Sequence, residues 1–130
     1  MPHITVEYSA NLEDQISPQK LVEKIHHAAL ATGLFEIGGI RTRAARRDLY
    51  CVADGDPTNG FIAVIARIGQ GRDIEARGHL ANAILSALKA ETEDVFKTRG
   101  LGLTVEVQEI QPPSLKHNNL HERIKARKTK

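Results

Sequence analysis

The sequence is poor in the residues that build disulfide frameworks and metal sites. It holds one cysteine, Cys51, so no disulfide can form within the chain and a reducing compartment is allowed. We interpret this thiol as a packed side chain, because nothing in its neighbourhood activates it. The six histidines are scattered without a His-Glu-x-x-His signature or a cysteine pair, so no metal site is expected.

Long apolar runs and a strong charge of one sign are also missing. No run approaches the roughly 18 residues that a membrane-spanning helix requires, and the N-terminus lacks a signal-peptide pattern. Basic residues outnumber acidic residues by 18 to 16, a net charge of +2, which makes a nucleic-acid partner unexpected. Walker loops and Gly-x-Ser-x-Gly elbows are absent from the sequence. We therefore expect a soluble, cytoplasmic protein without a membrane partner.

What the sequence does contain indicates one globular domain of the α+β class. Hydrophobic residues make up 41% and charged residues 26% of its 130 residues, enough for one core. A pattern of strand, helix and strand occurs twice, over about residues 1–52 and 60–110. Two βαβ units in succession predict a duplicated architecture, in which two long helices cover one face of a four-stranded sheet.

The first unit begins with strict alternation of apolar and polar side chains over residues 3–8, the period of a pleated strand. Ser17 can cap a helix that begins at Pro18, and Gly33 is expected to end it. A second strand is expected over roughly residues 40–52.

The second unit repeats this order. Residues 61–68 form a strand that is apolar at nearly every position, and Asp73 is a good N-cap for the next helix. That helix carries one apolar stripe over residues 80–95. Residues 103–108 alternate as a fourth strand, which the prolines at 112 and 113 end.

The apolar third strand predicts assembly of several copies. A strand that is apolar at every position is typically buried on both faces, and the chain has no third long helix for the second face of the sheet. Copies of the same subunit are the simplest cover. The alternative is that residues 112–130 fold back over that face, although they are mostly polar.

Pro2 has a chemical as well as a structural interpretation. A residue without an N–H fits the first position of a strand. If Met1 is removed, Pro2 carries a free secondary amine, and burial or nearby cations lower the pKa of such an amine. It can then act as a general base near neutral pH. The alternative is that Pro2 only begins the strand.

Arginines offer sites for an anionic substrate. The loop at residues 69–73 places Arg72 before a helix start, where a guanidinium and free backbone N–H groups can bind a carboxylate. The alternative is a tight turn with a solvated arginine. Arg41 and Arg43 share one face of the second strand and could lower the pKa of a proline amine, or could simply be solvated edge charges.

Together these features resemble the tautomerase superfamily, and within it the 5-carboxymethyl-2-hydroxymuconate Δ-isomerase family. The matching stretches run in order from the start of the chain to His121: residues 1–7, 31–35, 39–43, 53–55, 68–77 and 118–121. Residues 44–47 depart from the family pattern, because relatives are more apolar or aromatic there. The tail at residues 122–130 is basic and extends beyond the domain at residues 1–121.

The resemblance implies a mixed sheet, a homotrimer with active sites at subunit boundaries, and no metal or organic cofactor. It implies that Pro2 is catalytic after loss of Met1, and that Arg41 and Arg72 bind substrate carboxylates. The expected activity moves a double bond in 5-carboxymethyl-2-hydroxymuconate during homoprotocatechuate degradation. Alternatives are a tautomerase acting on phenylenolpyruvate or 2-hydroxymuconate, and a non-catalytic binding module that uses the basic tail. No role follows for His121.

Overall fold

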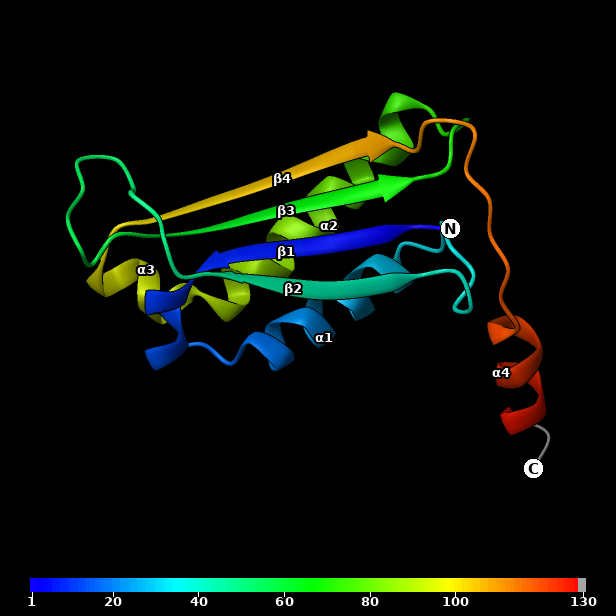
Figure 1. Ribbon diagram of the computed structural model, residues 1–130, viewed down its shortest axis with the longest axis horizontal. Coiled ribbons are helices and arrows are strands. Elements are labelled where there is room, and N and C mark those ends of the chain that lie inside the picture. Colours follow the sequence, from blue (N-terminus) through cyan, green and yellow to red (C-terminus); the bar gives the residue numbers. More distant parts are fainter. Residues whose placement is uncertain (129–130) are drawn as a thin grey trace.

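The computed structural model describes residues 1–128 and shows one four-stranded sheet with its two long helices on one face (Figure 1). In chain order the elements are β1 (His3–Ser9), the 3-10 helix η1 (Ala10–Asp14), α1 (Pro18–Ala31), β2 (Arg41–Arg47), β3 (Gly60–Ile68), α2 (Ile74–Glu91), α3 (Glu93–Thr98), β4 (Leu101–Glu109) and α4 (Leu120–Lys128).

The sheet confirms the duplicated βαβ architecture. Its strand order is β2-β1-β3-β4. Strands β1 and β2 are parallel, and so are β3 and β4, while the two central strands β1 and β3 are antiparallel. The sheet is therefore mixed, and each parallel pair is joined by a helix, as a βαβ unit requires.

The expected helix boundaries are largely confirmed. The Ser17 side chain accepts a hydrogen bond of 3.3 Å from the N–H of Lys20, and Asp73 accepts one of 2.8 Å from Ala76. Each bond satisfies one of the N–H groups that a helix start leaves free. Gly33 follows the end of α1 with φ of +76°, a conformation that glycine adopts without steric cost.

The core lies between the sheet and the helices α1 and α2. Alternate residues of β1 and β3 point into it, and the helices contribute one apolar stripe each. Its buried side chains include Ile4, Val6, Ile62, Val64, Ala66, Leu21, Ile25, Ala29, Leu80, Ile84 and Leu88. Among residues 1–128, no helix is both long and apolar enough to cross a membrane.

The second face of the sheet has no cover within the described chain. The helices lie behind the sheet in Figure 1, and the segment after β4 runs past the end of the sheet rather than across it. Ile65, at the centre of this open face, is 36% exposed and lies opposite Thr5 and Glu106. The tail at residues 112–128 therefore does not fold back over the open face.

Two expected boundaries are wrong for a reason that lies in the neighbouring strand. β2 ends at Arg47 rather than near residue 52, because its only partner, β1, ends at Ser9 opposite Arg47. β4 begins at Leu101 rather than 103, because its pairing with β3 begins at Gly60 and Leu101. Strand length here depends on the partner as much as on the strand's own residues.

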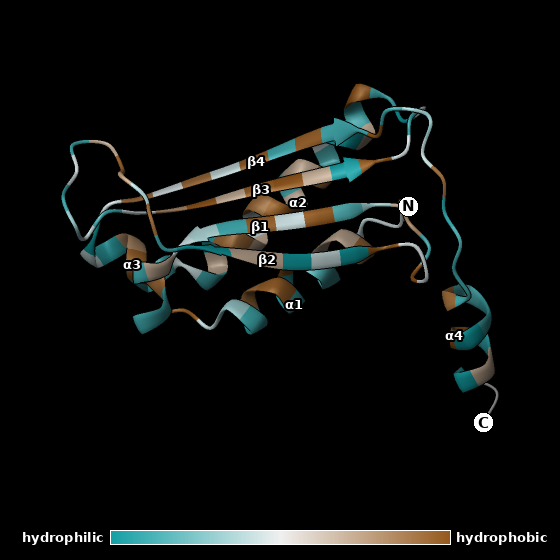
Figure 2. Ribbon diagram, viewed as in Figure 1, coloured by the Kyte–Doolittle hydropathy of each residue, from teal (hydrophilic) through white to brown (hydrophobic). Residues whose placement is uncertain are grey.

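Other expectations need correction. The apolar stripe at residues 80–95 spans two helices, since α2 ends at Glu91 and α3 follows after Thr92. Cys51 is exposed rather than packed, because the chain has left the sheet before reaching it. Residues 120–128, which include the described part of the tail, form the mostly hydrophilic helix α4 (Figure 2). The division between residues 121 and 122 stays a prediction, and it falls inside this helix.

Two glycines allow a matched test of packing. A Cβ at Gly60 would lie 2.7 Å from Leu12 Cδ2 and 3.0 Å from Ser9 Oγ, whereas one at Gly78 in α2 would meet nothing within 4 Å. We expect Gly60→Ala to lower the free energy of unfolding by about 1–3 kcal/mol through overpacking. Gly78→Ala should raise it by about 0.5–1 kcal/mol, because glycine weakens a helix interior.

Urea unfolding of both variants and the parent at one protein concentration measures the difference. Equal midpoints for the two variants would contradict this account of the packing at Gly60.

Candidate active site

The start of the chain lies at one end of the sheet, between two neighbouring strands. Pro2 is buried, and its carbonyl accepts a hydrogen bond of 3.1 Å from the backbone N–H of Arg41. A Cβ at Gly39 would lie 3.7 Å from Pro2 Cδ, so the loop before β2 passes close to the proline ring. The position of Pro2 is fixed by the sheet because β1 pairs on both sides.

Arg41 lies beside this terminus. Arg41 pairs with His3 in the sheet, and paired residues point to the same face, so the Arg41 side chain is on the open face. Its guanidinium donates to the Gly39 carbonyl at 2.9 Å and contacts Met1 Sδ at 3.6 Å. This places one positive charge at the very start of the chain.

Arg72 reaches the same end of the sheet from the β3–α2 loop. Its guanidinium donates to the carbonyl of Leu34 at 2.8 Å and to that of Gly69 at 3.5 Å. It also lies over the ring of Phe35, 4.9 Å from the ring centre, a cation–π contact. The head group is therefore held in place, and part of its hydrogen-bonding capacity remains for a ligand.

The backbone N–H groups of this loop contribute less than the sequence indicated. The N–H of Gly71 donates to the Glu109 carboxylate at 3.2 Å. The Asp73 carboxylate caps the helix start through Ala76. Protein carboxylates thus already occupy these donors, and carboxylate binding here depends on the Arg72 guanidinium.

Electrostatics at the terminus favour a neutral amine. The pKa of the Met1 amine is lowered from its ordinary value of 8.0, first by burial and then by the positive charges of Lys116, Arg41 and Arg72. Burial and like charges both disfavour the protonated form. A lowered pKa increases the neutral fraction of the amine, and the neutral form is the one that can accept a proton.

A cleft of about 310 Å³ opens beside the terminus. It is lined by Met1, His3, Gly69, Gln70, Ile110, Pro112, Ser114, Leu115 and Lys116. More than half of this lining belongs to the segment after β4, which Figure 1 shows passing the N-terminus. Sequence reasoning missed this wall and Lys116, because only the two prolines marked the segment, and they indicated no more than the end of a strand.

Arg43 is placed differently from the other arginines. It is exposed, and its guanidinium lies 3.1 Å from His3 Nδ1 on the open face. The pKa of His3 is lowered by burial first and then by Arg43, Arg41, the terminal amine and Arg67. Arg41 and Arg72 are among the cations that lower the pKa of the terminal amine, and Arg43 is not, so the structure separates Arg43 from them.

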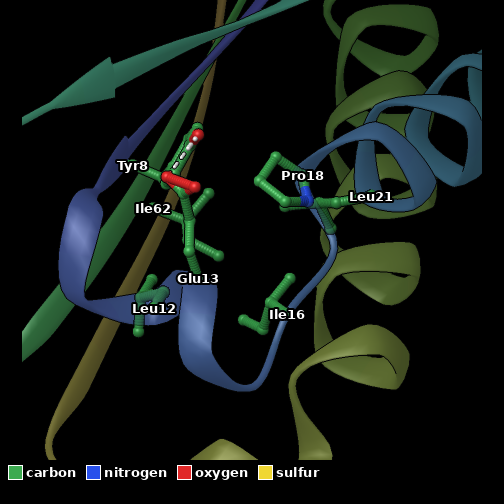
Figure 3. Close-up of a pocket in the computed structure, with 7 residues that line it drawn as sticks. All are labelled: Tyr8, Leu12, Glu13, Ile16, Pro18, Leu21 and Ile62. Carbon is green, nitrogen blue, oxygen red and sulfur yellow. Dashed lines mark hydrogen bonds between the residues drawn. The ribbon is translucent and has the colours of Figure 1, made fainter.

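A second hollow, at the opposite end of β1, is a packing defect of the core (Figure 3). It is lined by Tyr8, Leu12, Glu13, Ile16, Pro18, Leu21 and Ile62, and it encloses only about 10 Å³. The Tyr8 hydroxyl donates to Glu13 at 3.2 Å. A space of this size holds one water molecule at most. Within residues 1–128, no three histidine, cysteine or acidic side chains cluster in a metal-binding group.

Comparison with known proteins identifies the family. Residues 2–124 match the profile of a family described as 5-carboxymethyl-2-hydroxymuconate isomerase. The 5-carboxymethyl-2-hydroxymuconate Delta-isomerase of Escherichia coli is 31% identical over 122 residues, which cover 93% of this chain and 97% of the relative.

Solved structures agree. A 5-carboxymethyl-2-hydroxymuconate isomerase from Deinococcus radiodurans R1 superposes with a TM-score of 0.88 at 34% identity, covering 95% of this chain and 93% of that chain. A fused 4-OT protein, described as a symmetric trimer, shares the fold with a TM-score of 0.67 at 15% identity, covering 90% and 92%. The chain therefore belongs to the 5-carboxymethyl-2-hydroxymuconate isomerase family, and it is an enzyme with the tautomerase-like fold.

Proposed function

We propose that the protein isomerises 5-carboxymethyl-2-hydroxymuconate, with Pro2 as general base and acid after removal of Met1. One observation supports this most directly: Pro2 is buried between Met1 and His3, which line a cleft, and the positive charges of Lys116, Arg41 and Arg72 act on the terminal amine. A neutral amine beside cations suits an anionic dienol, whose hydroxyl proton must be removed. Family membership makes this substrate the first to test.

The reaction needs only proton transfer. The Pro2 nitrogen takes the enol hydroxyl proton, the O–H electrons form a C=O bond, and the double bond moves along the chain. A carbon then takes the proton back from the proline, so the product is an isomer of the substrate. A positioned acid–base group contributes about 10²–10⁴-fold to such a step.

The arginines bind and polarise the substrate. Arg72 would hold a carboxylate with two parallel hydrogen bonds, and Arg41 would hold another beside the amine. Both guanidinium groups are already oriented by backbone carbonyls, so little conformational freedom is lost on binding. Their charges also stabilise the negative charge that develops on the substrate oxygen.

The active molecule is a homotrimer in this proposal, with sites at subunit boundaries. The open face of the sheet offers Ile65 and Ala63 for burial, along with the Arg47–Glu7 ion pair of 2.6 Å. A relative with the same fold is described as a symmetric trimer. The alternative functions, tautomerases that act on phenylenolpyruvate or 2-hydroxymuconate, use the same proton-transfer chemistry. Several cations near the terminal amine favour 5-carboxymethyl-2-hydroxymuconate, because it carries more carboxylates than either alternative substrate.

The first prediction concerns the amine itself. A chain that retains Met1 has an amide at Pro2, whose nitrogen lone pair is tied up in resonance. It should fold and assemble as the processed chain does, yet lose nearly all turnover. Intact mass paired with a dienol ketonisation assay on the same sample measures both. Equal turnover by the two forms would show that Pro2 is not the base.

The second prediction concerns pH. A base must be neutral to act, so kcat/KM of the processed enzyme should rise with pH. The apparent pKa should lie below the ordinary value of a proline amine, because Pro2 is buried and the cations that lower the pKa of the neighbouring Met1 amine also disfavour a protonated Pro2 amine. A pH–rate profile of kcat/KM, measured at a protein concentration that keeps the trimer assembled, tests this. A midpoint at or above the ordinary value would contradict the assigned electrostatics.

The third prediction separates two arginines. Arg72→Ala should raise the barrier in kcat/KM by about 2–5 kcal/mol, since it removes the charge partner of a bound carboxylate. Arg43→Ala is the matched control and should cost less than about 1 kcal/mol, because Arg43 is exposed and is not among the cations acting on the terminal amine. Steady-state kinetics give kcat/KM of both variants and of the parent, each with its assembly verified. Losses of the same size would remove the distinction.

The fourth prediction concerns assembly. Sedimentation at micromolar concentration should show one species of three subunits. Ile65→Asp should dissociate it, because a buried, unpaired carboxylate costs several kcal/mol. Phe96→Asp is the matched control, since Phe96 is also exposed, at 56%, but lies in α3. A stable monomer of the parent chain would rule out the trimer.

A further inference from the structure

The segment that follows β4 is fixed at its first residue. The N–H of Ile110 donates to the Ile68 carbonyl at 2.7 Å, which extends the β3–β4 pairing by one bond. The Gln70 side chain donates to the Ile110 carbonyl at 3.3 Å. The segment therefore leaves the sheet directly beside the loop that carries Arg72.

The same segment is fixed again at its far end. The His121 ring packs directly on Gly38, where a Cβ would collide with it. His121 Nδ1 also lies 3.4 Å from Glu36 Oε2. Gly38 and Glu36 belong to the loop before β2, which carries Arg41. Residues 110–121 thus form a strap between the two loops that position the arginines.

Lys116 lies in the middle of this strap and lines the cleft beside Met1 and Gln70. Among the three cations that lower the pKa of the terminal amine, it differs in one respect. Arg41 and Arg72 donate to backbone carbonyls, whereas no hydrogen bond or ion pair engages the Lys116 ammonium within the described residues. Its three N–H donors are therefore free for a ligand.

The number of cations matches the number of charges on the proposed substrate. Muconate carries a carboxylate at each end, and the carboxymethyl group adds a third. Two arginines leave one carboxylate without a partner, and desolvating an unpaired carboxylate in a cleft is costly. A volume of about 310 Å³ lies at the lower end of the range for small-molecule sites.

We propose that Lys116 is a specificity-determining residue that binds the third carboxylate of the substrate, and that the strap at residues 110–121 holds it in place. This inference rests on the proposed function. It assigns His121 a positioning role, through its contact with Gly38, rather than a role in chemistry. It also explains why a polar segment is fixed at both ends across the cleft.

The experiment compares two substrates that differ only in the carboxymethyl group. Steady-state kinetics on 5-carboxymethyl-2-hydroxymuconate and on 2-hydroxymuconate are measured for the parent, Lys116→Ala, Lys116→Arg and the control Lys125→Ala. Lys125 lies in α4 and does not line the cleft. The ratio of the two KM values is the readout, because a change in amine basicity affects both substrates alike.

Lys116→Ala should raise the ratio of tricarboxylate KM to dicarboxylate KM about tenfold, the scale of a hydrogen bond to a charged group. Lys116→Arg should restore most of it, and Lys125→Ala should match the parent. An unchanged ratio in Lys116→Ala would overturn the proposal, and so would an equal change in Lys125→Ala.

A binding measurement separates this inference from the proposed function. If the parent turns over neither substrate, the proposed function fails, and calorimetry with inert tricarballylate and glutarate still tests Lys116. The alanine variant should lose affinity about tenfold for the tricarboxylate and less for the dicarboxylate. Equal affinities in parent and variant for both probes would show that Lys116 binds no third carboxylate.

Discussion

The structure depends on one constraint, which is that the first strand of the chain is a central strand of the sheet. β1 pairs with β2 on one side and β3 on the other. The terminus is therefore held on both sides, and the bond from the Arg41 N–H to the Pro2 carbonyl closes the ladder at its end. Chain termini are usually mobile unless a sheet or helix ties them down. Here the sheet gives the first residues a fixed position, which a terminal catalytic amine requires.

Three distant parts of the sequence bring positive charge to that position. Arg41 comes from the start of β2, Arg72 from the β3–α2 loop and Lys116 from the segment after β4. Like charges repel one another, so this grouping gains stability from the carbonyls that accept hydrogen bonds from the arginines. A bound anion would relieve the repulsion among these charges, so the grouping is typical of a site rather than of a core feature.

The sequence predicted the elements whose signals are local. Strand alternation and the caps at Ser17 and Asp73 depend on neighbouring residues alone, and they were confirmed. The end of β2 at Arg47 was missed because the neighbouring strand determines it. The strap was missed because its path depends on contacts at its two ends, such as that of His121 with Gly38. Pro2, Arg41 and Arg72 were singled out from strand position, loop context and charge, the resemblance then implied their roles, and these roles stay predictions.

The duplication has a consequence for the count of sites. The backbone repeats itself, so the entry to β3 mirrors the entry to β1 at the other end of the sheet, and there the Gly60 N–H donates to the Gly100 carbonyl at 2.9 Å. Gly60 lies inside the chain, so its nitrogen is a peptide amide, whose lone pair is tied up in resonance. A single chain has one terminal amine, whereas two separate chains have two. If a terminal amine does the chemistry, two repeats joined in one chain therefore carry one reactive centre instead of two. On the proposed mechanism, the repeated βαβ architecture of the backbone therefore comes with a single reactive end.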